Sequence, residues 1–232
     1  MVKKWISLSE LGGDRWIIPI WGAVVAAVNA GKVRQLNQEV QERGLAISIR
    51  LNMLPRIIDR INTQCDEVYS IIESHEQEHE FTPQQEGYAM IIDDELKYNL
   101  LVDIDSLLFE LNSCCELMNK LFEELYKHVG NPIKEKQVGT RIRKILEEKE
   151  LNTDWFIMLD EHRNFFIHEG APYVAVDISN EPTVYDLLIM KENIKDFNDS
   201  SKFLRLSDLN TILHGFSKAK PVIQSHLAGL FK

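Results

Sequence analysis

The chain has 232 residues and a formal net charge of -10, with 44% hydrophobic and 27% charged residues. This length is enough for one large domain whose core needs neither disulfides nor a structural metal. The negative charge excludes a protein that coats nucleic acid non-specifically, because such binding comes mainly from neutralising phosphates. Its three cysteines are an odd number without a disulfide or zinc-knuckle spacing, which predicts a reducing, cytoplasmic location.

The first predicted element is the apolar, uncharged segment Trp16 to Val28. It is shorter than the roughly 20 residues that a membrane span needs. Asp14 and Arg15 directly precede it, which is unlike a signal peptide. We therefore expect a buried core helix in a head that ends near Gly31, in preference to a membrane-associated segment or a patch that faces a partner.

Two helical segments are predicted next, on either side of Pro55. Apolar residues recur at roughly helical spacing before it, although Gly44 weakens the prediction of one continuous helix. Pro55 is expected to reset the chain, because proline removes a hydrogen bond and its ring clashes with the preceding turn. One apolar face then runs from Ile58 to His79, and residues 82–94 are expected to be a connection. The apolar positions before Pro55 are Val33, Leu36, Val40, Leu45, Ile49 and Leu51.

The longest regular element is a predicted helix that begins near Asp94 and stops at Gly130-Asn131-Pro132. Its apolar residues alternate steps of three and four, and a second row at a heptad period widens the stripe. So broad a buried face is typical of a helix at the centre of a bundle or at a dimer seam. The stripe comprises Leu101, Ile104, Leu108, Leu111, Cys115, Met118, Phe122 and Leu125, widened by Leu100, Leu107, Cys114 and Leu121.

The last third of the chain changes its period. Short β-prone runs at about 173–190 predict a β-hairpin, and Phe203 to Leu206 predicts a further short strand. Before these runs, we expect a helix over 141–149 that is capped by Gly139-Thr140. A second helix is expected to be capped by Asn152 or Thr153 and ended by Gly170-Ala171-Pro172. After the runs, we expect a last helix that is capped by Ser207 and kinked at Pro221.

The predicted fold is mainly α: a helical bundle with a small β-hairpin inserted before the last helix. We expect a single domain over 1–232, in which 1–90 form an N-terminal helical extension packed on a core of 91–232.

The most informative motif is the hexad Arg163-Asn164-Phe165-Phe166-Ile167-His168. An arginine fork matches phosphate oxygens, and a histidine exchanges a proton near neutral pH. Five residues along a helix separate the two side chains by about 140°, so they could flank one cleft at a helix end or between two subunits. The alternative is a surface arginine and a histidine that ends a helix, where the helix dipole favours positive charge.

A basic stretch from Lys134 to Lys144 precedes this helix. Its cations could line the cleft and bind backbone phosphates. They could equally belong to a solvated helix start, with Arg141 or Lys144 paired with Glu147 or Glu148. The candidate RNA-binding residues are Lys136, Arg141, Arg143 and Lys144.

His75-Glu76-Gln77-Glu78-His79 is an alternative site, because two histidines four residues apart can share a zinc ion beside a glutamate base. The segment is acidic, lies at a helix end and has no obvious further ligand motif, so we expect a polar helix end. The adjacent Cys114 and Cys115 are expected to be small core residues. One acid among Asp103, Asp105 and Glu110 could orient Arg163 or His168, although solvated acids are the simpler interpretation.

A long amphipathic helix, a basic connection and a helix carrying R-N-x-x-x-H together resemble the HEPN superfamily (higher eukaryotes and prokaryotes nucleotide-binding domain). The resemblance covers roughly residues 94–230, and Arg163, Asn164 and His168 match the family motif. It implies an up-and-down helical bundle that dimerises with both motifs facing one cleft. The hairpin and the apolar head lie outside the minimal family bundle.

The resemblance implies a metal-independent endoribonuclease without cofactors, of the kind found in toxin–antitoxin and abortive-infection defence. His168 would act as base or acid, Arg163 would hold the phosphate and Asn164 would orient it, leaving a 2′,3′-cyclic phosphate. An antitoxin or nucleotidyltransferase partner is also implied. Two alternatives stay open: a non-catalytic HEPN nucleotide-binding or interaction module, and a metal-dependent hydrolase that uses His75, Glu76 and His79.

Overall fold

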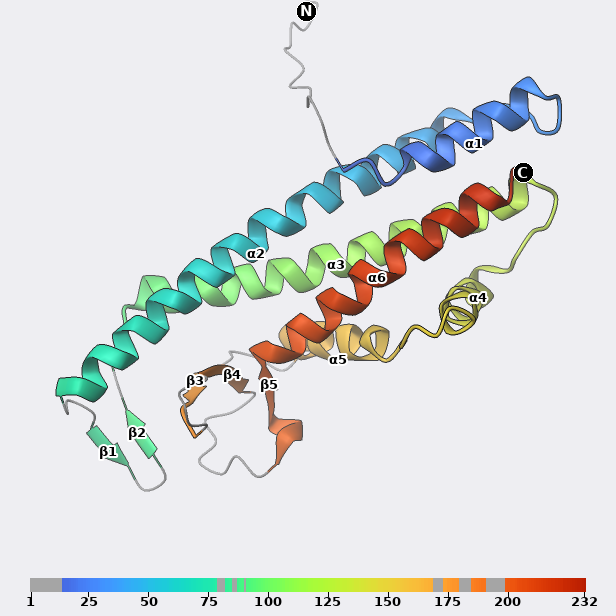
Figure 1. Ribbon diagram of the computed structural model, residues 1–232. Helices are drawn as coiled ribbons and strands as arrows, with labels where there is room; N and C mark the ends of the chain where they lie inside the picture. The colour runs from blue at the N-terminus through green and yellow to red at the C-terminus, as the bar shows by residue number, and fades with distance from the viewer. Residues whose placement is uncertain are drawn as a thin grey trace, which may run out of the picture.

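The computed structural model describes residues 14–78, 82–84, 87–89, 91–168, 173–179, 185–190 and 199–232, with backbone alone over 75–78 and in the first two strands. This part of the chain is mainly helical, which confirms the predicted class (Figure 1). In chain order its elements are α1 (Ile18–Asn29), α2 (Gln38–Glu78), β1 (Thr82–Gln84), β2 (Gly87–Ala89), α3 (Asp94–His128), α4 (Glu135–Glu147), α5 (Trp155–His168), β3 (Tyr173–Asp177), β4 (Asp186–Met190), β5 (Phe203–Arg205) and α6 (Leu206–Gly229).

The long helices α2 and α3 form an antiparallel pair held in register by ion pairs. Arg43 Nε lies 2.9 Å from Glu124 Oε2, Arg50 Nη1 lies 2.6 Å from Glu110 Oε2, and Arg60 Nη2 lies 2.6 Å from Asp103 Oδ1. The arginine numbers rise along α2 while their partners' numbers fall along α3, as an antiparallel pair requires. The ion pairs therefore fix which turn of α2 faces which turn of α3.

The expectation that Pro55 resets the chain is wrong, because α2 continues through it as one helix of 41 residues. Pro55 itself is exposed, while Leu51, Leu54 and Ile57 around it are buried. Burial of apolar side chains on both sides of the proline offsets the hydrogen bond that it cannot donate. Packing against α3 thus overrides the local break.

The predicted phase of the first part of α2 is also partly wrong. Leu45 and Ile49 are 57% and 49% exposed, whereas Ile47 is fully buried. Gly44 is buried against α1, where an added Cβ would lie 2.3 Å from the Trp21 ring. Close contact between Gly44 and α1 therefore determines which face of this stretch is buried, and that face differs from the one that the periodicity suggested.

Helix α3 matches its prediction closely. It begins at Asp94. The Asp93 carboxylate caps the first turn of the helix by accepting a hydrogen bond from Glu95 N at 2.7 Å. Gly130 follows the helix with φ of 82°, a left-handed conformation that glycine adopts at little cost. Every residue of the predicted stripe is buried except Cys115, which is partly buried, and Cys114 is completely enclosed.

Helix α1 is anchored to α6 by the residues just before it. Trp16 is 5% exposed and its Nε1 donates to Lys220 O at 2.8 Å, while Lys220 Nζ lies 3.4 Å from Asp14 Oδ2. The predicted core helix is thus buried on one side only, through Ile20, Val24 and Ala27, and Ile18 and Val25 are each 56% exposed. No described helix combines the length and apolar character that crossing a bilayer requires.

Helix α4 begins at Glu135, six residues before the start expected at Arg141. Gly139 and Thr140 therefore lie within the helix and do not cap it. The buried side chains Val138, Ile142 and Ile145 repeat at helical spacing, and this face holds α4 against the rest of the bundle. Figure 1 shows α4 lying across the direction of the long helices.

The predicted β-hairpin is present as β3 and β4, paired antiparallel from Tyr173↔Met190 to Asp177↔Asp186. The predicted third strand, β5, pairs with β4 and completes a three-stranded sheet. Arg205 joins the edges of this sheet, since its Nη1 lies 3.1 Å from Asp177 Oδ2 and 3.3 Å from Asp186 Oδ2.

The segment predicted as a plain connection contains a second, two-stranded hairpin of β1 and β2.

The predicted cap of the last helix is wrong, because Ser207 lies inside it. Helix α6 begins at Leu206, and the Ser207 hydroxyl donates to Asp186 Oδ2 at 2.8 Å. Asp208 accepts from Arg205 N at 3.3 Å and closes the first turn. Helix α6 then continues through Pro221 to Gly229.

Candidate functional site

Helix α5, which carries the hexad, is fixed at its N-terminal end against α6. The Asn152 Oδ1 accepts from Asp154 N at 2.6 Å just before the helix begins. Trp155 is 3% exposed and packs on Gly215, where a Cβ would lie 2.3 Å from Trp155 Cδ1. Only a residue without a side chain allows α5 and α6 to approach so closely here. Residues 169–172, where the helix was predicted to end, lie outside the described residues.

One face of α5 is open to solvent and includes two residues of the hexad. Asn164 and His168 are exposed and lie four residues apart, so their side chains are neighbours on the helix surface. We call this face the outer stripe of α5; it comprises Ile157, Asp160, Glu161, Asn164, Ile167 and His168. The imidazole of His168 is thus available to a substrate and is not enclosed in the core.

Arg163 occupies the edge of the outer stripe. It is partly buried, and its Nε is enclosed without a hydrogen-bond partner among the described residues. The Nε atom of Arg163 is therefore not available to a substrate, and only the rest of its guanidinium could be. On the helix surface the closer pair is Asn164 with His168, which are four residues apart.

The neighbouring His162 is a residue that the sequence prediction missed. It is 6% exposed, and its Nε2 lies 3.7 Å from Asp208 Oδ2 at the start of α6. Burial lowers the pKa of His162, and the Asp208 carboxylate opposes that shift only in part. The neutral ring therefore belongs to the contact between α5 and α6, directly behind Arg163. His162 and Asp208 are far apart in the sequence, so no local sequence pattern could have predicted that they come together.

Two of the three acids proposed to orient the hexad have other partners. Asp103 accepts from Arg60 and from Gln64 Nε2 at 3.0 Å, and Glu110 pairs with Arg50. Asp105 is exposed on α3. Asp103 and Glu110 thus hold α2 to α3, and the hydrogen bonds from Arg60 lower the pKa of Asp103.

The basic stretch is divided between two faces of α4. Arg141 and Lys144 line a groove of about 810 Å³ beside the end of α3. Arg143 instead lies over the Phe156 ring, 5.7 Å from its centroid, and Lys136 is exposed. Phe156 is at the first turn of α5, and the twelve residues from there to His168 span about 18 Å. Arg143 thus lies near the opposite end of α5 from His168.

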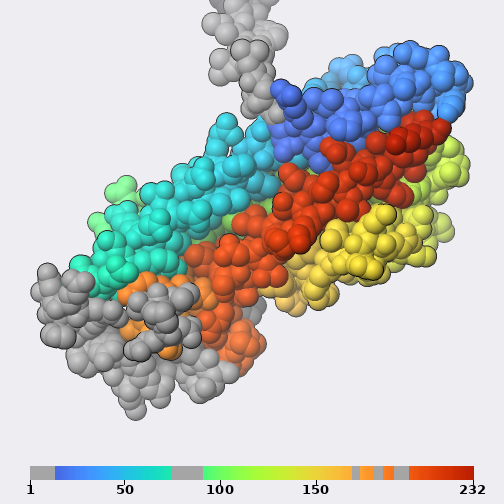
Figure 2. All heavy atoms as spheres, in the orientation of Figure 1, coloured from blue at the N-terminus to red at the C-terminus, as the bar shows by residue number. Residues whose placement is uncertain are grey.

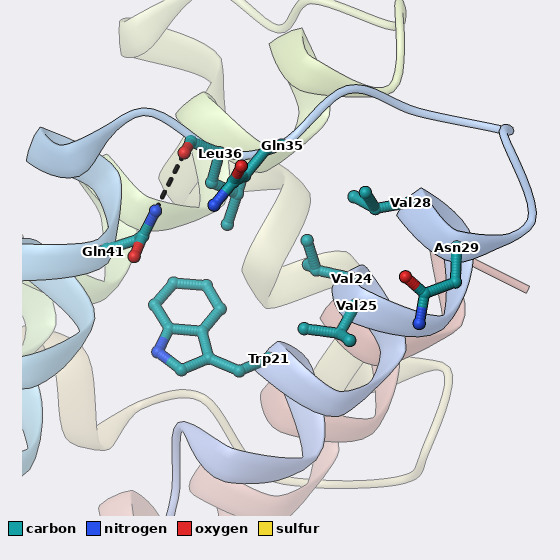
Figure 3. A pocket seen from close by; sticks show the side chains of 8 residues that line it. All are labelled: Trp21, Val24, Val25, Val28, Asn29, Gln35, Leu36 and Gln41. Carbon is teal, nitrogen blue, oxygen red and sulfur yellow. Dashed lines mark hydrogen bonds between the residues drawn. The ribbon is translucent and has the colours of Figure 1, made fainter.

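A second cavity, of about 370 Å³, lies between α1 and the start of α2. Figure 3 shows Trp21 at its entrance and Val24, Val25 and Val28 along the α1 wall. The Gln41 amide donates to Leu36 O at 2.9 Å on the other wall. No described titratable side chain lines this cavity, and α5 contributes to the described lining of neither cavity.

The alternative metal site at His75, Glu76 and His79 lies outside the described side chains. Elsewhere, in the part of the chain that is described, no three histidine, cysteine or acidic side chains gather closely enough to hold a metal ion. Burial raises the pKa of the Cys114 thiol to about 12, which keeps it protonated and unreactive.

Comparison with protein-family models, with curated proteins and with solved structures gives no match for this chain. The case for a function therefore rests on the residues and geometry described above.

Proposed function

We propose that this chain is a HEPN-type, metal-independent endoribonuclease whose active site forms between two copies. The observation that supports this most is the solvent exposure of His168, one helical turn from exposed Asn164, with Arg163 at the edge of the same region. A general base must reach its substrate, and an imidazole at an open helix end meets that requirement.

The proposed reaction needs an RNA 2′-OH. His168 takes the 2′-OH proton while the oxygen attacks the adjacent phosphorus. The bond from phosphorus to the 5′ oxygen breaks, and His168 of the partner subunit protonates that leaving oxygen. Arg163 offsets the charge on the phosphate oxygens in the transition state, and Asn164 orients them. The products are a 2′,3′-cyclic phosphate and a 5′-hydroxyl end, so DNA cannot react.

Two copies are required because one chain supplies a single exposed imidazole on α5. Ile157 and Ile167 on the outer stripe are 49% and 51% exposed, which is apolar surface that a second copy would cover. Contact through this stripe would bring both His168 side chains into one interface. Asp160 and Glu161 lie further toward the N-terminal end, so phosphate would bind at the His168 end of the stripe.

RNA cleavage in the presence of EDTA tests the proposed activity. We expect His168→Ala and Arg163→Ala each to lower the cleavage rate about 10²- to 10⁴-fold, the usual range for general acid–base catalysis. His214→Ala, which removes another exposed histidine on α6, is the matched control and keeps the wild-type rate. Activity that survives His168→Ala, or that EDTA abolishes, contradicts the proposal.

The oligomeric state tests the composite site separately. Ile167→Asp is expected to convert a dimer to monomers in light scattering and to abolish cleavage. Val102→Asp changes an equally apolar side chain, 61% exposed on α3, and should leave the dimer intact. Monomers in the wild type, or a dimer disrupted only by Val102→Asp, would rule out a site built on the outer stripe.

A non-catalytic interaction module is the second candidate. Asp160 and Glu161 favour it, because carboxylates on the outer stripe repel RNA phosphates yet suit contacts with a basic partner. A dimer that depends on Ile167 and cleaves no RNA would identify this module.

A further inference from the structure

The groove beside α4 is a positive concavity on an acidic protein. It lies between the end of α3, the turn that follows it and one face of α4, and Figure 2 shows α4 on the visible surface beside α6. Arg141 and Lys144 line it, with no acidic residue among the lining side chains. The whole chain carries 36 acidic residues against 26 basic ones, so the described lining of this groove differs in charge from the chain as a whole.

Among the described residues, the two cations in the groove have no ion-pair partner. Glu147 and Glu148 follow Lys144 within one helical turn, but neither pairs with Arg141 or Lys144 in the described part of the chain. The pairing of Arg141 or Lys144 with Glu147 or Glu148 is therefore not among the described ion pairs, and both cations are exposed, as on the solvated helix face that was the alternative. Two unpaired positive charges three residues apart can act on one anion.

The other polar side chains in the groove can all donate hydrogen bonds. Asn131 and Gln137 supply amides, and Thr140 supplies a hydroxyl. Tyr126 closes the inner side, where its hydroxyl lies 2.6 Å from His226 Nε2 and its ring stacks on Phe122 with centroids 4.7 Å apart. Because Tyr126 is only 7% exposed, its ring face offers a base little stacking surface, and recognition depends on charge and hydrogen bonds.

We propose that this groove is a binding site for a phosphate group, held by Arg141 and Lys144 with Asn131, Gln137 and Thr140 as further donors. Arginine binds phosphate as a planar fork and lysine as a point charge. A groove of about 810 Å³ is large enough for a nucleotide-sized ligand. The site is on different elements from the outer stripe of α5, so it stands whether or not the chain cleaves RNA.

The phosphate could belong to a free mononucleotide or to an RNA backbone, and the experiment separates these sources. Calorimetric titration of the full chain uses inorganic phosphate and adenosine 5′-monophosphate. Fluorescence anisotropy uses a short oligoribonucleotide with a 5′-hydroxyl, which presents phosphodiesters alone. We expect saturable binding of inorganic phosphate at millimolar concentration. Tighter binding of the mononucleotide assigns the site to a phosphomonoester, and tighter binding of the oligomer assigns it to an RNA backbone.

The variants Arg141→Gln and Lys144→Gln should each weaken binding on the order of ten- to a hundredfold, the usual effect of losing a charge-assisted hydrogen bond. Lys149→Gln removes the same charge from an exposed residue outside the groove and should retain wild-type affinity. Circular dichroism verifies that all variants are folded. Absence of saturable phosphate binding, or an equal loss in Lys149→Gln, overturns the proposal.

Discussion

At the scale of single residues, the position of α5 depends on a glycine in α6. A Cβ at position 215 would lie 2.3 Å from Trp155 Cδ1 and 2.4 Å from Trp155 Cγ, and Trp155 is buried, so its ring has little room to move. The hexad is on the helix that Trp155 begins. A small change at Gly215 therefore acts on the candidate site through packing alone.

We predict that Gly215→Ala lowers the free energy of unfolding by about 1–3 kcal/mol, the usual cost of overpacking. The matched control is Gly139→Ala inside α4, where no atom lies within 4 Å of an added Cβ. That change should raise stability by about 0.5–1 kcal/mol, because alanine is the better helix former. Urea denaturation of both variants measures the difference. Equal stabilities would contradict the close contact at Gly215.

The buried His162 predicts how stability depends on pH. Its pKa is lowered in the folded chain by burial, so the unfolded chain binds the proton more readily. His162 therefore stabilises the fold fully above the unfolded pKa, about 6.5, and this stability is lost as pH falls through the folded value. We expect His162→Gln to make the fall in stability below that pH shallower, by up to about 1.4 kcal/mol per pH unit. Unfolding curves at several pH values measure the slope, and an unchanged slope would contradict a buried neutral His162.

At the scale of elements, the register of α2 on α3 depends on half-buried ion pairs. Asp103 is 7% exposed and accepts from Arg60 and Gln64, which satisfies the carboxylate where solvent reaches little of it. Removing Asp103 would leave the Gln64 amide and one side of Arg60 without their acceptor. Its neighbour Asp105, two residues along the same helix, is exposed and offers a comparison.

We predict that Asp103→Ala lowers the free energy of unfolding by about 1–3 kcal/mol at neutral pH, the range for hydrogen bonds to a charged group. Asp105→Ala should change it by less than about 0.5 kcal/mol. Because Arg60 lowers the pKa of Asp103, the wild-type advantage is present above the ordinary aspartate pKa of 3.8 and is lost as pH falls through the folded value. Denaturation at neutral and acid pH tests both statements, and a cost that stays constant into acid would contradict the ion pair.

At the scale of the whole molecule, one cluster of buried apolar residues runs from Trp16 to Phe231. It joins α1 to the long helices and to α6, although α1 and α6 lie near opposite ends of the sequence. The contact depends on Trp16, which donates to Lys220 O and accepts from Gln224 Nε2 through its carbonyl. A shared core predicts that the described helices unfold together.

We predict that Trp16→Ala costs about 3–5 kcal/mol of stability, the usual loss for deleting a buried aromatic side chain. Val25→Ala, at a position 56% exposed on α1, is the control and should have little effect. Thermal melts of the wild type followed by circular dichroism and by tryptophan fluorescence should have coincident midpoints. Two separate transitions in the wild type would show that α1 is an independent unit.

Much of the fold was predictable where local spacing carries the information. The stripe of α3 repeats without interruption, and its buried residues are those expected from a helical period. The β-hairpin was found because β-prone runs begin after residue 172 and because Asn180 and Pro182 favour a turn. In the hexad, the spacing indicated that Arg163 and His168 lie about 140° apart if they share a helix, and both are on α5.

The positions of most helices and strands could be inferred from the sequence alone, because backbone geometry sets the period of side chains within each element. Tertiary packing, in contrast, selected which face of each element is covered. It kept α2 continuous through Pro55 and placed Gly44 against Trp21. It also brought His162 close to Asp208, and it placed Arg141 and Lys144 on a different face of α4 from Arg143. Each of these outcomes depends on contact between segments distant in the chain, where packing energy exceeds local preference.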